Sequence, residues 1–159
     1  MTKTRSLALF CFLILVVVVL DARGRIKRTC ATDRTALTAA INRLIDNDNA
    51  ANLEGLLAGY SEDAVLLPPQ GNIISGRSAL RPHYERIFNA SRLSLSALVV
   101  EAQANGNLGF VRGETKGTAS PRAGGASISV NDKFLALVRC EEGEWVVSHL
   151  MWSPNSSSL

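Results

Sequence analysis

The sequence predicts an α+β domain in which three helices pack on one face of a strongly curved, mostly antiparallel sheet. Three observations support this expectation. Apolar residues recur at helical spacing in the first half of the chain, apolar and polar residues alternate along extended runs in the second half, and turn signals separate those runs. A length of 159 residues is enough for one such domain.

Two helices are expected at the start of the domain. The first is predicted over residues 33–47, where Leu37, Ile41 and Leu44 share one face. The sequence Asn47-Asp48-Asn49 is expected to end it. A short second helix is predicted over residues 53–57 and closes at Gly59.

A short hairpin and a third helix are expected next. Residues 64–67 are predicted to form a strand that Pro68-Pro69 ends, because proline cannot donate a hydrogen bond to a neighbouring strand. Ile73-Ile74 is predicted to return as a second short strand. The third helix is predicted over residues 77–89, with Pro82 in or near its first turn, where proline is tolerated.

Four long strands are expected in the second half of the chain, over residues 93–104, 108–117, 127–140 and 144–152. The last two are apolar on both faces, since Leu135 and Leu137 alternate with Phe134 and Ala136. A sheet that buries one face under helices and has a second apolar face is expected to use that face for a partner. The sequence therefore predicts a homodimer formed by sheet-to-sheet packing.

The segments that flank the domain indicate the secretory route. Residues 1–24 are interpreted as a signal peptide, because the apolar residues 7–20 follow a basic start and precede small residues. The alternative is an uncleaved membrane anchor formed by residues 7–20. Residues 25–32 are interpreted as a basic linker, in which "RIKR" is either a processing site or a solvated stretch. The polar residues 154–159 are expected to be disordered.

The domain itself is slightly acidic. Residues 1–28 hold six of the 17 basic and one of the 14 acidic residues, so the remainder has 11 basic and 13 acidic residues. The high pI therefore belongs to the targeting segment, and no nucleic-acid-binding surface is expected.

Two further features fit a secreted protein. Cys30 and Cys140 are compatible with one disulfide, although two free thiols or an intermolecular bridge are equally open. Asn89 and Asn155 each begin an Asn-x-Ser tripeptide, so both are candidate glycosylation sites.

The segments "YSEDAVLLPPQGNIISGRSALRPHY" and "KFLALVRCEEGEWVVSHLMW" resemble the nuclear-transport-factor-2-like superfamily, also called SnoaL-like or ketosteroid-isomerase-like. Family members typically have Tyr-x-x-Asp-Ala-Val, a proline pair, a Gly-containing turn and Gly-Arg, and later a Gly-x-Trp turn and a terminal Met-Trp. The match is nearest to the family's uncharacterised isomerase homologues and covers about residues 33–153. It implies a cone-shaped fold with a pocket between helices and sheet.

The resemblance also implies which side chains line this pocket. His83 and Tyr84 would come from the third helix, and strand alternation adds further side chains. A shift of the register by one residue would exchange the inward-facing and outward-facing side chains of a strand. The expected pocket residues on the strands are Phe110, Arg112, Glu114, Asp132, Phe134, Ala136, Ser148, Leu150 and Trp152.

The resemblance argues against steroid isomerase chemistry. That reaction uses a carboxylate base and an oxyanion hole made of a tyrosine and a protonated aspartic acid. Here the resemblance places Pro68 at the base, Leu44 at the tyrosine and Ala136 at the acid. All three functional groups are therefore missing.

Two main classes of function remain. The first is a secreted homodimer that binds a small, partly apolar ligand. The second is a lyase, isomerase or cyclase in which His83 acts as a base, Tyr84 as a donor and Asp132 as a positioning group. An oligomerisation module is a third reading. No metal or other cofactor is expected, because the sequence has no zinc-ligand spacing and no phosphate-binding loop.

Overall fold

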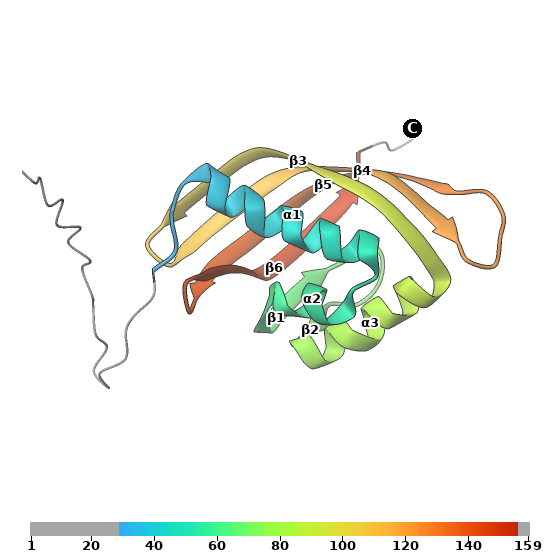
Figure 1. Ribbon diagram of the computed structural model, residues 1–159, viewed down its shortest axis with the longest axis horizontal. Coiled ribbons are helices and arrows are strands. Elements are labelled where there is room, and N and C mark those ends of the chain that lie inside the picture. The colour runs from blue at the N-terminus through green and yellow to red at the C-terminus, as the bar shows by residue number, and fades with distance from the viewer. Residues whose placement is uncertain (1–28, 156–159) are drawn as a thin grey trace, which may run out of the picture.

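A strongly curved sheet encloses a long helix in the computed structural model, which describes residues 29–155 (Figure 1). The predicted signal peptide, residues 25–28 of the predicted linker and residues 156–159 of the predicted tail lie outside the described residues. The elements in chain order are α1 (Arg34–Ala50), α2 (Leu53–Ala58), β1 (Tyr60–Leu67), β2 (Ile74–Ser75), α3 (Arg77–Ala90), β3 (Ser91–Asn105), β4 (Leu108–Pro121), β5 (Ile128–Glu141) and β6 (Glu144–Pro154).

The six strands form one sheet in the order β2-β1-β6-β5-β4-β3. Only β1 and β6 run parallel, and every other neighbouring pair is antiparallel. Helix α1 lies along the concave face of the long strands, while α2 and α3 pack beside β1 (Figure 1). This arrangement confirms the predicted α+β fold.

Helix α1 continues past the point where the sequence predicts its end. Asp33 caps its start by accepting a hydrogen bond from the Ala36 backbone N–H at 2.9 Å. Near its other end, the Asn49 side chain exchanges two hydrogen bonds with the Leu95 backbone, at 2.8 and 2.7 Å. Asn49 thus attaches the last turn of α1 to β3, and residues 47–49 continue the helix instead of ending it. The helix closes at Ala51, which has a left-handed backbone.

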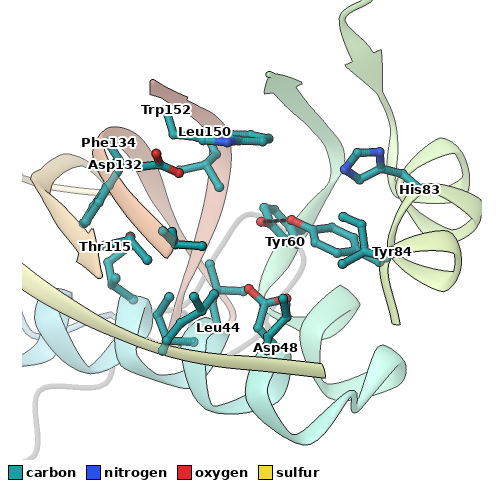
Figure 2. Close-up of a pocket in the computed structure, with 16 residues that line it drawn as sticks. Leu44, Asp48, Tyr60, His83, Tyr84, Thr115, Asp132, Phe134, Leu150 and Trp152 are labelled. Atoms are coloured by element: carbon teal, nitrogen blue, oxygen red, sulfur yellow. Dashed lines mark hydrogen bonds between the residues drawn. The ribbon is translucent and has the colours of Figure 1, made fainter. Parts of the chain in front are cut away.

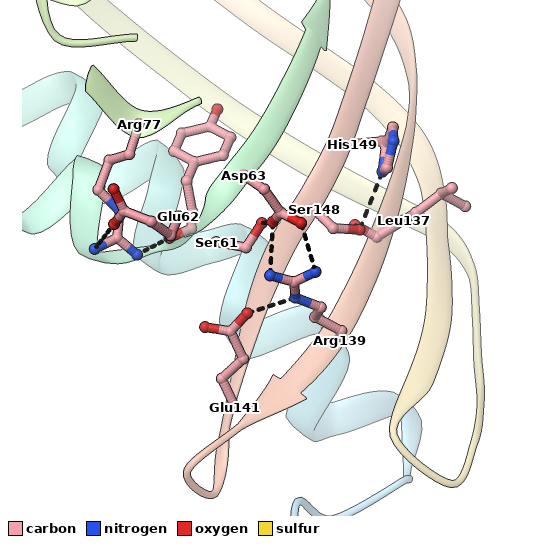
Figure 3. A network of polar contacts seen from close by, with 10 residues as sticks. Ser61, Glu62, Asp63, Arg77, Leu137, Arg139, Glu141, Ser148 and His149 are labelled. Atoms are coloured by element: carbon pink, nitrogen blue, oxygen red, sulfur yellow. Dashed lines mark hydrogen bonds and ion pairs between the residues drawn. The ribbon is translucent and has the colours of Figure 1, made fainter. Parts of the chain in front are cut away.

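The Gly-Arg pair after β2 joins α3 to β1. Gly76 has φ 86°, a conformation that glycine adopts without strain. The Arg77 guanidinium donates to the Tyr60 carbonyl and forms an ion pair with Glu62 at 3.4 Å (Figure 3). Pro82 lies inside α3, near its first turn as the sequence predicts, and is exposed.

Two β-bulges change which residues face inward. In β6, Leu137 pairs with His149 and Val138 pairs with Val147, so Ser148 is the extra residue. In β3 the corresponding irregularity lies between Val99 and Glu101. The inward-facing side chains therefore belong to odd-numbered residues before each bulge and to even-numbered residues after it.

The start of the described chain is attached to the far end of the sheet. Cys30 and Cys140 form a disulfide that closes a sequence separation of 110 residues. Beside it, the Trp145 indole N–H donates to the Ala31 carbonyl at 2.7 Å. Among residues 29–155, no helix is long and apolar enough to cross a bilayer.

Candidate functional site

A cavity of about 170 Å³ lies between α1, α3 and the concave face of the sheet. Its walls are mostly apolar, and the polar groups gather in a few places (Figure 2). The lining residues are Ile41, Leu44, Ile45, Asp48, Tyr60, His83, Tyr84, Ile87, Leu93, Leu95, Thr115, Val130, Asp132, Phe134, Leu150 and Trp152.

Two buried tyrosines meet in this cavity. The hydroxyl oxygens of Tyr60 and Tyr84 are 2.6 Å apart, and one donates a hydrogen bond to the other. The rings lie 5.9 Å apart between centroids. Burial raises the pKa of both phenols, and the nearby Asp48 carboxylate raises it further. Both side chains are therefore neutral at physiological pH.

Asp48 is the most perturbed acid of the cavity. It lies on α1 near the two tyrosines (Figure 2), and its Oδ1 atom is buried without a hydrogen-bond partner among the described residues. Burial raises the pKa of Asp48 from 3.8 to about 7. The side chain can therefore gain or lose a proton near neutral pH, which is the property required of a general acid or base.

Sequence reasoning missed Asp48 and did not assign Tyr60 to the site. A signal for Asp48 was present, because it follows Leu44 by four residues and Ile41 by seven and so shares their buried helix face. The neighbouring asparagines obscured this signal, since Asn-Asp-Asn is typical of a turn. Tyr60 precedes the expected strand, but in the structure it is the first residue of β1.

His83 and Asp132 lie on opposite sides of the cavity. The His83 ring packs edge-on against Tyr84, with centroids 5.3 Å apart. Burial, with a smaller effect of Arg86, lowers the pKa of His83, so the imidazole is neutral at physiological pH. Asp132 lies on β5 near Phe134 and Trp152 (Figure 2), where burial raises its pKa.

The cavity brings together six of the residues that the sequence places in the pocket. His83 and Tyr84 line it from α3, where the resemblance places them. The other four come from β5 and β6 and are Asp132, Phe134, Leu150 and Trp152. Their ligand-binding or catalytic roles stay predictions.

The predicted face of β4 is wrong by one residue. Val111, Gly113 and Thr115 point inward, so Phe110, Arg112 and Glu114 lie on the outer face. The alternation was misleading because the inner face includes Gly113, where a Cβ atom would collide with the Leu98 carbonyl oxygen. Glycine is needed there because β3 and β4 approach closely.

The outer-face groups have other partners. Arg112 forms an ion pair with Glu101 at 2.6 Å, and Glu114 forms one with Lys116 at 2.8 Å. Arg112 and Glu114 both border a second hollow of about 510 Å³ on the outer face. Neither residue lines the cavity.

Ser148 is also absent from the cavity wall. Ser148 is the extra residue of the β6 bulge. Its hydroxyl donates a hydrogen bond to the Leu137 carbonyl at 3.2 Å and contacts the His149 ring (Figure 3). The prediction that Ser148 lines the cavity is therefore wrong, because the bulge was not expected. Leu150 and Trp152, which follow the bulge, face inward as predicted.

The three residues that the resemblance places at the steroid isomerase positions are Leu44, Ala136 and Pro68. Leu44 lines the cavity as an apolar wall, and Ala136 is fully buried on the inner face of β5. Pro68 follows the end of β1 and does not line the cavity.

The candidate modification sites lie at exposed positions. Asn89 is exposed near the end of α3, and Asn155 is exposed just after β6, so their glycosylation stays a prediction. Within residues 29–155, no three His, Cys, Asp or Glu side chains gather closely enough to hold a metal ion.

The fold and the cavity define a ligand-binding or isomerase-type α+β domain. Residues 41–148 match the family model of the SnoaL-like domain, so the chain belongs to this family within the nuclear-transport-factor-2-like superfamily. This confirms the predicted family. No curated protein matches the sequence.

Solved structures share the fold over most of the chain. A ketosteroid isomerase-like protein from Erwinia carotovora atroseptica is 25% identical, with a TM-score of 0.71 over 77% of this chain and 96% of its own. A candidate dehydratase of the nuclear-transport-factor-2-like family from Streptomyces avermitilis is 12% identical, with a TM-score of 0.69 over 79% and 98%. A nuclear-transport-factor-2-like protein of unknown function from Pseudomonas putida is 19% identical, with a TM-score of 0.63 over 80% and 92%.

Proposed function

We propose that this protein binds a small, mostly apolar molecule in the cavity between α1, α3 and the sheet. The observation that carries the proposal is the cavity itself, whose apolar walls surround a few convergent polar groups. A cavity of about 150 Å³ in another protein is known to hold benzene. The cavity here, at about 170 Å³, fits a molecule built on a single ring.

Steroid isomerase activity is not part of this proposal. The cavity is small for a four-ring substrate, and the family positions for the base and the oxyanion hole carry Pro68, Leu44 and Ala136. The outer pair of predicted pocket residues, Arg112 and Glu114, is also unavailable for a substrate in the cavity.

Ligand binding is tested by NMR titration with 2-phenylethanol. The indole N–H resonance of Trp152, which lines the cavity, should shift in a saturable way. The resonance of Trp145 should stay constant, because its indole N–H is bound to Ala31 on the other side of the fold. Equal shifts of both resonances, or no shift at all, would contradict the proposal.

A matched pair of variants on β4 locates the site. Thr115 lines the cavity, whereas Thr118 is exposed on the same strand. Thr115→Phe should fill the cavity and weaken 2-phenylethanol binding at least tenfold. Thr118→Phe should leave it unchanged.

An isomerase- or lyase-type reaction in the same cavity is the second candidate function. It is favoured by the convergence of a neutral imidazole at His83, a phenol at Tyr84 and an acid of pKa about 7 at Asp48. Exchange of the α-protons of acetophenone in D₂O, followed by NMR, tests it. Catalysed exchange that is lost in His83→Ala supports the reaction, and a rate equal to that of buffer excludes this form of it.

We also propose that the domain is secreted and works as a homodimer. The Cys30–Cys140 disulfide supports the first part, because such bonds persist in oxidising compartments. Exposed apolar residues on the outer face of the sheet support the second. They are Leu98, Val100, Leu135, Leu137 and Met151, each between 37% and 61% exposed.

A further inference from the structure

The electrostatic character of the cavity selects among single-ring ligands. Five of the lining residues have ionisable side chains, namely Asp48, Tyr60, His83, Tyr84 and Asp132. Among the described residues that line it, none is Lys or Arg. With both phenols and the imidazole neutral, the only charges that the lining residues can supply are the two negative carboxylates.

Asp48 is the cavity residue that lacks a hydrogen-bond partner. Its buried Oδ1 has no hydrogen-bond donor among the described residues, and an orphaned buried carboxylate oxygen is costly. Nearby, the linked hydroxyls of Tyr60 and Tyr84 keep unused oxygen lone pairs. A ligand group that donates several hydrogen bonds and carries a positive charge would satisfy Asp48 Oδ1 and would have further donors for a tyrosine oxygen.

The remaining walls suit the same kind of molecule. Phe134 and Trp152 present aromatic surface beside Asp132, and such surface attracts cations as well as apolar groups (Figure 2). Two exposed basic side chains act on cavity residues without lining the cavity: Arg86 contributes to the lowered pKa of His83, and Lys133 opposes the effect of burial on the pKa of Asp132. An anionic ligand would meet two like charges and no cation among the lining residues.

We propose that the cavity recognises a single-ring primary amine in its ammonium form, with Asp48 as the binding carboxylate. The proposal rests on the proposed ligand-binding function and adds the chemical class of the ligand. The ammonium group would donate to Asp48 Oδ1, its ring would occupy the apolar part of the cavity, and a carboxylate of the same size would be excluded. A hydrogen bond to a charged partner is stronger than one to a neutral partner, and the difference corresponds to about tenfold in affinity.

The test uses three probes that differ in one group: 2-phenylethylamine, 2-phenylethanol and phenylacetate. Each is titrated into the folded protein at pH 8 while the Trp152 indole N–H is followed by NMR. The amine should bind at least tenfold more tightly than the alcohol, and phenylacetate should bind least. If the alcohol or phenylacetate binds as tightly as the amine, this inference fails while the proposed function stands. If no probe binds, both fail.

Asp48→Asn separates recognition from folding. This variant should bind the amine no more tightly than the alcohol, because the counter-charge is gone and a buried ammonium would be left unpaired. Asp46→Asn, an exposed change on the same helix, should keep the full preference for the amine. An amine preference that survives in Asp48→Asn would overturn the role of Asp48.

The pH dependence gives an independent readout. Ammonium binding requires ionised Asp48, whereas the amine itself stays protonated between pH 6 and pH 8. The affinity of the amine should therefore rise about tenfold over this range, and that of the alcohol should not rise in parallel. The other ionisable groups that line the cavity are His83, whose pKa burial lowers, Asp132, whose pKa burial raises, and the two tyrosines, which stay neutral. Amine affinity that is constant from pH 6 to pH 8 would count against Asp48 as the partner.

Discussion

Asp48 has a cost for the folded protein as well as a proposed use. Its pKa is 3.8 in an exposed chain and about 7 in the folded domain because of burial. Below pH 3.8 the carboxyl group is neutral in both states, so it has no effect on stability. Between pH 4 and pH 7 the unfolded chain ionises while the folded protein keeps its proton, so folding becomes less favourable as pH rises.

Asp48→Asn should therefore stabilise the protein in a pH-dependent way. We expect little change in the free energy of unfolding at pH 4 and a gain of a few kcal/mol at pH 8, with most of the rise before pH 7. Urea unfolding at several pH values measures this, with Asp46→Asn as the control. A stability difference that is the same at pH 4 and pH 8 would show that burial of this carboxyl group is not its source.

At the scale of single elements, sequence patterns located the helices and strands but did not determine which strand residues face inward. The four long strands agree with their predicted positions within a few residues, because each run of alternating residues ends at a turn signal. The inward face of β4 was not predictable from apolar alternation. Apolar Leu108 and Phe110 lie on its outer face, while glycines take inner positions at Gly109 and Gly113.

The candidate site was predictable where helical spacing is regular. Tyr84 follows from the apolar face of α3, His83 from the family resemblance, and Phe134 from regular alternation on β5. Asp48 was hidden because Asn-Asp-Asn is typical of a turn, and the hydrogen bonds of Asn49 to Leu95 that hold this segment in the helix are long-range and not visible in a local pattern. The Tyr60–Tyr84 contact joins residues 24 positions apart and likewise depends on tertiary structure.

At the scale of the whole molecule, the outer face of the sheet is the surface proposed for dimerisation. Leu135 is 37% exposed, and Met151 beside it is 48% exposed. Pairing two such faces would remove this apolar surface from water. A stable pair would be expected to bury at least about 1,000 Å² in total.

Native mass spectrometry of protein recovered from the medium of its host tests secretion and assembly together. We expect a dimer whose chains begin at Arg25, after removal of the predicted signal peptide. Leu135→Asp should give a monomer that keeps its fold and its ligand binding. Ile73→Asp, at another exposed apolar residue, should remain dimeric. A wild-type monomer at micromolar concentration would argue against the dimer, and an intact N-terminus would argue against cleavage.

The bulge at Ser148 has a consequence for comparing relatives of different length. Because the extra residue is accommodated at one point, Val147 before it and Leu150 after it both face inward. A relative that lacks this residue could keep the same inner wall, provided that its alignment gap is placed at the bulge. A gap placed elsewhere in β6 would mismatch cavity residues with surface residues over the intervening stretch and would obscure any shared ligand preference. In this family, correct gap placement is therefore a condition for transferring ligand chemistry between members.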